Sequence, residues 1–179
     1  MTIATALYSS VKTDWETPPD LFAQLKAQFS FTLDVCATRQ NRKCAAHFTP
    51  EQDGLRQRWT GTCWMNPPYG RALGAWIRKA RKESVCGATV VCLVPARTDT
   101  VWWHSDVMKA REIRLLKGRL TFVGAQAPAP FPSAVVIFKR NRPTRRVTPR
   151  VLSWDWRAAE RPRRTAGLHR ALTSRNVFS

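Results

Sequence analysis

The stretch Cys63–Gly70, written CWMNPPYG, joins a side-chain amide, two prolines and an aromatic ring. Proline fixes φ and removes a backbone donor, so neither a helix nor a central strand can continue through Pro67 and Pro68. The side-chain oxygen of Asn66 and the carbonyl of Pro67 are two hydrogen-bond acceptors that this stiff turn can hold in place. Tyr69 follows with a ring face beside this pair. The alternative is an ordinary turn at the end of a strand, with Tyr69 in the core.

Two carboxylates and a threonine are further candidates for chemistry. Asp34 closes the apolar run FSFTLDV, and Asp53 stands in an Asp-Gly pair. Aspartate also caps helices and starts turns, so each carboxylate has a structural alternative. Thr17 and Pro18 come just before a helical pattern, where they could cap the helix or direct its N–H groups at an anion.

Metal and disulfide chemistry find no support in the sequence. The three histidines are scattered, and the five cysteines have no CxxC spacing. This pattern indicates neither a zinc site, nor a catalytic triad, nor a disulfide framework. We therefore expect no metal and reduced core thiols.

Helix-like and strand-like segments alternate along the chain. Apolar residues at helical spacing predict helices over Asp20–Gln28 and Gly74–Ser84. Strand-like segments predict five strands: Phe29–Val35, Thr62–Met65, Ala88–Val94, Glu112–Leu116 and Ser133–Phe138. Ala88–Val94 is a continuous β-branched run, which is typical of a strand covered on both faces. This alternation predicts an α/β fold with a mostly parallel sheet and helices on both faces. Ligands of such sheets bind at the carboxyl ends of the strands, where Asp34 and Asn66 are both expected.

Charge indicates the class of partner. The 179 residues include 30 Lys and Arg against 12 Asp and Glu, a net charge of +18. Such a field attracts polyanions, and since no amphipathic membrane helix is evident, nucleic acid is the expected partner. Composition changes at residue 141: segment 141–179 carries ten Arg against two acids, so +8 of the total lies there. We expect one domain over residues 1–140 and a basic C-terminal arm over 141–179.

The motifs together resemble a known family. The ordered segments WETPPDLF, LDVCA, EQDGL, WMNPPYG, VPARTDT and APFPSAVVIF are similar to bacteriophage-type DNA adenine-N6 methyltransferases, the Dam-like family, from about Trp15 to Lys139. The resemblance implies a Rossmann-like fold that uses S-adenosylmethionine to methylate adenine in a short site of double-stranded DNA. It implies that Asn66, Pro67, Pro68 and Tyr69 are catalytic, with the acceptor pair on the amine and the ring stacked on an extruded base.

The resemblance also assigns binding residues. It implies cofactor contacts at Thr17, Pro18, Asp34, Cys36, Ala37 and Asp53. The turn LDVCATRQNRK departs from the usual methyltransferase scheme because it lacks glycine, which normally allows close backbone approach. We expect Arg71, Arg97 and Thr98 to contact DNA, although Arg97 could instead pair with Asp99.

Other functions stay open at this point. An NPPY enzyme could methylate RNA or a protein glutamine, and a relative without turnover could simply bind DNA. The resemblance implies a phage or prophage origin and action in the bacterial cytoplasm, and a monomer is favoured. GATC is the first DNA site to test.

Overall fold

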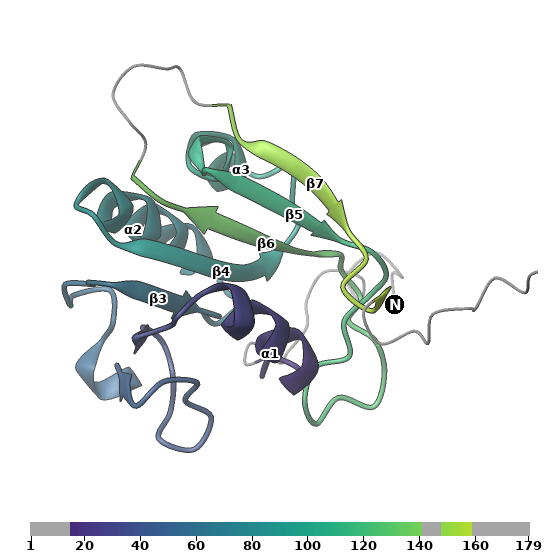
Figure 1. The fold of residues 1–179 in the computed structure, drawn as a ribbon, viewed down its shortest axis with the longest axis horizontal. Helices are drawn as coiled ribbons and strands as arrows, with labels where there is room; N and C mark the ends of the chain where they lie inside the picture. Colours follow the sequence, from purple (N-terminus) through teal and green to yellow (C-terminus); the bar gives the residue numbers. More distant parts are fainter. Residues whose placement is uncertain (1–14, 141–147, 159–179) are drawn as a thin grey trace, which may run out of the picture.

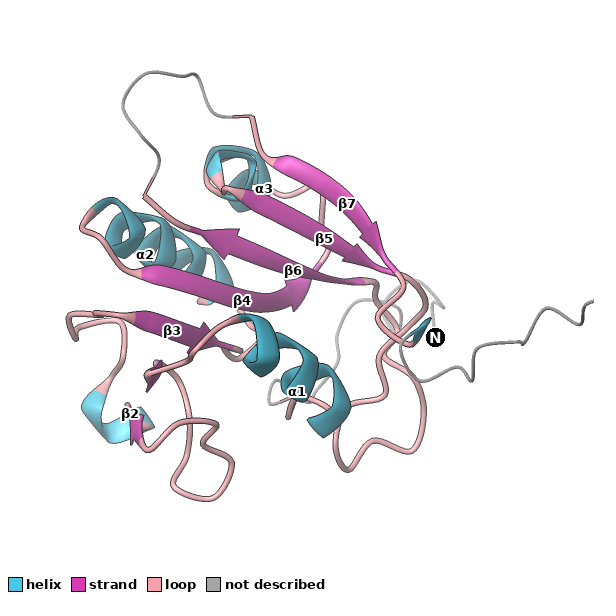
Figure 2. Cartoon of the chain, viewed as in Figure 1, coloured by secondary structure: helices cyan, strands magenta, loops and turns pink. Residues whose placement is uncertain are grey.

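The computed structural model describes residues 15–140 and 148–158. They form a seven-stranded sheet in the order β2-β1-β3-β4-β6-β5-β7. The strands are β1 Leu33–Asp34, β2 Ala46–His47, β3 Thr62–Met65, β4 Thr89–Pro95, β5 Glu112–Leu116, β6 Ser133–Phe138 and β7 Arg150–Trp154. Only the two pairings of β6 are antiparallel, and the other four are parallel (Figure 2). The predicted α/β fold with a mostly parallel sheet is confirmed, and β3, β5 and β6 have the predicted bounds.

Helices cover both faces of the sheet, as predicted. Helix α1 (Pro19–Gln28) lies on one face, and α2 (Leu73–Val85) and α3 (Val101–Ser105) lie on the other (Figure 1). Short 3₁₀ turns follow at Pro50–Gln52 and Val107–Lys109. Each long helix buries one apolar stripe, which in α1 consists of Leu21, Phe22 and Leu25.

The centre of the sheet is the core of the protein. All six residues of β6 are buried, as are six of the seven in β4. Both strands are covered by helices and loops, which explains their continuous β-branched runs without polar alternation. The rigid centre fixes where β3 and β4 end, and therefore where the residues after them lie.

Strand β1 is much shorter than predicted. The run Phe29–Val35 was expected to be extended throughout, but only Leu33 and Asp34 pair with neighbours. Phe31 instead stacks on Phe22 of α1, with ring centroids 5.5 Å apart. Aromatic packing against the helix therefore replaces strand pairing in the first half of the run. Residues 35–45, which connect β1 to β2, contain no helix.

Strand β7 lies beyond the domain boundary expected at residue 140. It pairs in parallel with β5 along its whole length, and Lys117 N–H donates to the Trp154 carbonyl at 3.0 Å. Trp156, just after β7, is buried, and its carbonyl accepts from the Gln24 side chain at 2.7 Å. Residues 150–156 are thus part of the sheet and its packing, whereas 141–147 and 159–179 of the expected arm lie outside the described residues.

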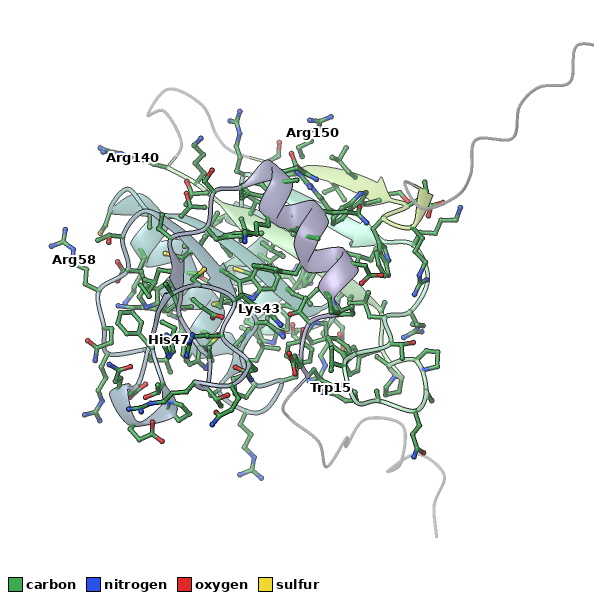
Figure 3. The ribbon with its side chains drawn as sticks, turned by 60° about the horizontal axis from the view of Figure 1, so that its bottom comes forward. Trp15, Lys43, His47, Arg58, Arg140 and Arg150 are labelled. Atoms are coloured by element: carbon green, nitrogen blue, oxygen red, sulfur yellow. The ribbon has the colours of Figure 1, made fainter. Side chains whose placement is uncertain are left out.

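Basic side chains project from the described surface. Arg58 and Arg140 point outward at the periphery of the molecule, while Lys43 lies near its centre (Figure 3). None of the helices in the described ranges is both long and apolar enough to cross a membrane.

The packing of β7 generates a prediction about the domain boundary. A chain that ends at Arg140 loses β7 and the buried Trp156, so we expect it to unfold more easily by about 3 kcal/mol or more than a chain that ends at Ala158. Urea unfolding of the two chains measures the difference. Equal midpoints and slopes would mean that β7 contributes nothing to the fold.

Candidate functional site

A cavity of about 420 Å³ lies at the carboxyl ends of β1 and β3. Its walls come from the segment before α1, the connection from β1 to β2, the 3₁₀ turn and the start of the NPPY segment. Eight predicted site residues line it: Thr17, Asp34, Cys36, Ala37, Asp53, Asn66, Pro67 and Pro68. The volume is within the usual range of small-molecule sites.

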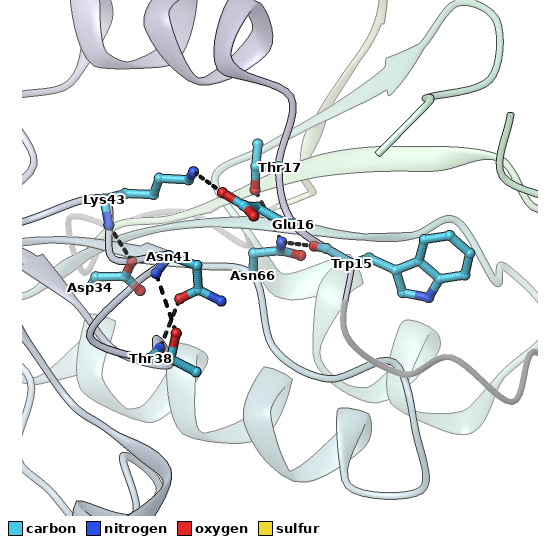
Figure 4. Close-up of polar contacts among 8 residues, drawn as sticks. All are labelled: Trp15, Glu16, Thr17, Asp34, Thr38, Asn41, Lys43 and Asn66. Atoms are coloured by element: carbon cyan, nitrogen blue, oxygen red, sulfur yellow. Dashed lines mark hydrogen bonds and ion pairs between the residues drawn. The ribbon is translucent and has the colours of Figure 1, made fainter. Parts of the chain in front are cut away.

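The side-chain amide of Asn66 is fixed at the cavity wall. Its nitrogen donates to the Trp15 carbonyl and, at 3.0 Å, to the hydroxyl oxygen of Thr17 (Figure 4). A carbonyl can only accept, so the nitrogen must face Trp15, and Oδ1 must point the other way. The segment before α1 therefore determines the orientation of this amide.

Tyr69 lies in the core rather than at the cavity wall. Only 4% of its surface is exposed, and its ring packs edge-on against Phe122 and Phe131. Its hydroxyl donates to Asn66 Oδ1 at 2.9 Å and lies 3.1 Å from the Leu93 carbonyl. Burial raises the pKa of Tyr69 well above its ordinary value, so the hydroxyl stays a donor. A core position for Tyr69 was the alternative that the sequence left open. In this arrangement the face of its ring is not available to a base.

A buried carboxylate organises the loop after β1. Asp34 is 3% exposed, and its oxygens accept from the backbone N–H groups of Lys43 at 2.9 Å and Cys36 at 3.4 Å. Burial raises the pKa of Asp34, and these two hydrogen bonds partly oppose the rise. No helix follows for Asp34 to cap, since residues 35–45 contain none. It shapes the cavity wall by folding the loop back on itself.

An ion pair closes one side of the cavity. The ammonium of Lys43 lies 3.1 Å from Glu16 Oε1, and the Lys43 side chain is only 17% exposed (Figure 4). The Glu16 carbonyl also accepts from Val123 N–H at 3.0 Å. Residues 15–17 therefore connect three elements at the site: the NPPY segment, the loop after β1 and the loop after β5.

Cys36 and Ala37 form part of the floor. Burial raises the pKa of the Cys36 thiol well above its ordinary value, and the nearby Asp34 carboxylate adds to the rise. The thiol is therefore protonated and inert at neutral pH. Ala37 N–H donates to the Phe48 carbonyl at 3.0 Å, which ties the floor to the end of β2.

Asp53 and Gly54 form another part of the cavity wall. Asp53 adopts the left-handed conformation with φ 48°, which aspartate tolerates better than most residues. Its carboxylate accepts from Leu55 N–H at 3.2 Å and pairs with Arg56 at 3.2 Å. A Cβ on Gly54 would stand 2.1 Å from the Val35 carbonyl oxygen, so only glycine fits beside β1.

The other predicted site residues lie away from the cavity walls. Pro18 is the residue before α1 and is buried, so it, and not Thr17, occupies the capping position. Arg71 is exposed after the NPPY segment. Arg97 and Thr98 follow β4 at the same sheet edge, and the described residues include no ion pair between Arg97 and Asp99.

Several residues of the cavity wall were not predicted from the sequence, among them Glu16, Asn41, Lys43 and Gly54. Asn41 Oδ1 accepts from Thr38 N–H at 2.7 Å, which shapes the loop after β1. Lys43 was detectable in principle as a cation shortly after a strand that ends in an acid. The Asp-Gly pair indicated a turn at Gly54, but nothing in the sequence indicated that Gly54 lies against Val35.

No group of three or more His, Cys, Asp or Glu in the described parts of the chain could hold a metal ion.

Comparisons with known proteins identify relatives. Residues 4–151 match the family model described as DNA N-6-adenine-methyltransferase (Dam). The chain is 35% identical over 113 residues to a DNA N-6-adenine-methyltransferase of Haemophilus phage HP1, covering 61% of this chain and 65% of that protein. It is 29% identical over 116 residues to a DNA N-6-adenine-methyltransferase of Escherichia phage T1, covering 63% and 48%. The matched regions thus span less than two thirds of the length of each relative.

The contact between Gly54 and Val35 generates a prediction. Gly54→Ala forces a methyl group into a backbone oxygen, so we expect a loss of about 3 kcal/mol in the free energy of unfolding, or failure to fold. Gly124→Ala is the control: Gly124 has φ 71°, but a Cβ there would meet no atom within 4 Å, so it should lose only about 1–2 kcal/mol. Similar losses in urea unfolding would contradict the close approach at residue 54.

Proposed function

We propose, from the premise that this chain belongs to the DNA N-6-adenine-methyltransferase (Dam) family, that it methylates N6 of adenine in double-stranded DNA. The single observation that best supports this activity is the fixed amide of Asn66 at the wall of the cavity. The phage relatives support action on DNA in the bacterial cytoplasm. A short site such as GATC is the first candidate.

Asn66 and Pro67 act on the amine in this proposal. The amine of adenine is a poor nucleophile because its lone pair is delocalised into the ring. Oδ1 of Asn66 accepts from Tyr69 but has a second lone pair, which can accept one N–H of the amine. The Pro67 carbonyl accepts the other N–H, and the two bonds favour the tetrahedral nitrogen that attacks. Because the acceptors are already oriented, little reorganisation is needed as charge develops.

Tyr69 has two proposed roles that act at different times. In the arrangement described here its hydroxyl positions Asn66 Oδ1. To stack on an extruded base, the ring must first rotate away from Phe122 and Phe131. Stacking then holds the adenine beside the acceptor pair.

The charged groups in the cavity fit S-adenosylmethionine. This donor carries an ammonium, a sulfonium and a carboxylate, and the cavity lining holds three carboxylates and one ammonium: Glu16, Asp34, Asp53 and Lys43. Lys43 is the one cation in the described lining, so we assign it to the donor's carboxylate and Glu16 to the donor's ammonium. Asp53, beside Gly54, suits the amine of the donor's adenine. When bound, the group would supply an electrophilic methyl carbon to N6. The bond from this carbon to sulfur would break and leave S-adenosylhomocysteine, and the proton lost from N6 would pass to water.

The reaction is tested with tritiated S-adenosylmethionine and adenine-containing duplex DNA. We expect label in N6-methyladenine, and a loss of about 10²- to 10³-fold in turnover for Asn66→Ala, because one oriented acceptor is removed. Tyr69→Phe should retain more turnover than Tyr69→Ala, since it keeps the ring. Label recovered in RNA or a protein glutamine instead would favour those substrates, and binding of DNA without any label would indicate a non-catalytic relative.

The assignment of Lys43 is tested by binding, without turnover. S-adenosylhomocysteine carries the amino-acid group, whereas 5′-methylthioadenosine lacks it. Lys43→Met should bind S-adenosylhomocysteine about tenfold or more weakly, because a charge-assisted hydrogen bond is lost. Its affinity for 5′-methylthioadenosine should be unchanged. Lys82→Met, on the exposed side of α2, is the control. Equal weakening of both compounds would show that Lys43 supports the cavity instead of binding the carboxylate.

A further inference from the structure

The ends of β5 and β7 carry a cationic patch, which we define as Lys117, Arg119 and Arg157. We propose that this patch binds the phosphate backbone of the DNA duplex on one flank of the target adenine. The proposal rests on the proposed function, since it assigns a further surface to the same substrate. Arg157 belongs to the expected basic arm over 141–179, but the sequence did not single out any of these three residues as a DNA contact.

Arg157 is held in place before any partner arrives. Its guanidinium lies over the Trp156 ring, 4.4 Å from the centroid, and one nitrogen donates to the Arg119 carbonyl at 3.0 Å. Trp156 is itself 2% exposed and anchored to α1 by Gln24. Gly118, with φ 78°, passes close beneath, and a Cβ there would stand 3.2 Å from Arg157. Packing has thus already fixed a side chain that would lose much entropy on binding if it were free.

The patch keeps charge available for an anion. Lys117 pairs with Asp155 at 2.9 Å, but the ion pairs among the described residues include no acid partner for Arg119 or Arg157. Guanidinium has five donors in a fork that suits phosphate, and only one is engaged by the Arg119 carbonyl. The hydrogen bonds of the described residues give the other donors of Arg157 no protein acceptor, so these donors are available to an anion.

Strand direction puts the patch on the same edge as Asn66. Asn66 follows β3, Lys117 follows β5 and Asp155 follows β7, and the strand pairings make these three strands run the same way. The edge therefore carries both the proposed amine acceptors and the patch. Arg140 follows β6, which runs the other way, so it lies at the opposite edge, far from Trp15 (Figure 3).

Sheet geometry gives the distance along the DNA. Four strand spacings separate β3 from β7 in the order β3-β4-β6-β5-β7, which is roughly 19 Å at about 4.8 Å each. One strand of DNA advances about 3.4 Å per nucleotide, so a duplex that follows the sheet edge would meet the patch about five or six nucleotides from the target adenine. The patch should then contact flanking DNA and leave the target base itself untouched.

The experiment uses the full chain and two duplexes, built around the site that sequencing of N6-methyladenine identifies. One duplex has ten base pairs on each side of the target and the other has three. We expect Arg157→Gln to bind the long duplex about three- to tenfold more weakly, with a salt slope lower by about 0.9, and the short duplex as the parent does. Arg157→Lys should recover part of the loss, and Arg140→Gln should bind both duplexes as the parent does.

The outcomes separate this proposal from the proposed function. Binding of S-adenosylhomocysteine should be unchanged in Arg157→Gln, and its urea midpoint should fall only slightly, because one hydrogen bond and one cation–π contact are lost. This combination excludes a damaged fold. A parent that methylates DNA while Arg157→Gln binds the long duplex normally would overturn the patch alone. Equal losses on both duplexes, or an equal loss in Arg140→Gln, would also overturn it. A parent that neither binds nor methylates DNA would overturn the proposed function and the patch together.

Discussion

The hydrogen bonds between the Asn66 amide and the segment before α1 are the interaction on which the site depends. Asn66 lies at the end of a central strand, but its orientation comes from Trp15 and Thr17, about fifty residues earlier in the chain. That segment is in turn held by the Glu16–Lys43 ion pair and by Val123. Four elements must therefore be in place before the amide presents its oxygen. Such mutual support is the usual way in which a protein holds one rotamer of a polar group.

Dependence on distant segments also separates the strands that the sequence could predict from those that it could not. β3 and β6 were predicted to the residue because a continuous apolar run has only one favourable position in a sheet covered on both sides. β5 was also predicted to the residue, although it carries Glu112 and Arg114 and is only partly buried. β1 was overestimated because the aromatic residues before Leu33 prefer the surface of α1. β7 was missed because its short run RVLSW lies between arginine-rich stretches and was interpreted as part of the basic arm. Its stability comes from pairing with β5 and from the burial of Trp156 just beyond it, and neither is visible in local composition.

The site residues also divide into those that local sequence could predict and those whose position depends on distant segments. Asp34 and Asn66 were predictable, because the ends of parallel strands meet at one edge. The position of Tyr69 was not, since a ring beside a rigid turn can face a ligand or the core, and Phe122 and Phe131 come from a distant loop. Lys43 and Glu16 are adjacent only after the loop has folded around Asp34. Thr17 has the sequence of a helix cap, but the amide of Asn66 takes its hydroxyl oxygen.

Gly54 accounts for the missing glycine in the turn after β1. Close approach of backbone to backbone beside a ligand requires one partner without a Cβ, and the partner need not belong to the turn itself. Here the turn has side chains throughout, and Gly54 from a later segment lies against the Val35 carbonyl instead. Trp59 holds Gly54 there by donating to its carbonyl at 2.8 Å, and Trp76 lies directly beneath it. Gly54 thus allows a close backbone contact at the end of β1, while Cys36 and Ala37 in the turn keep their side chains at the cavity wall.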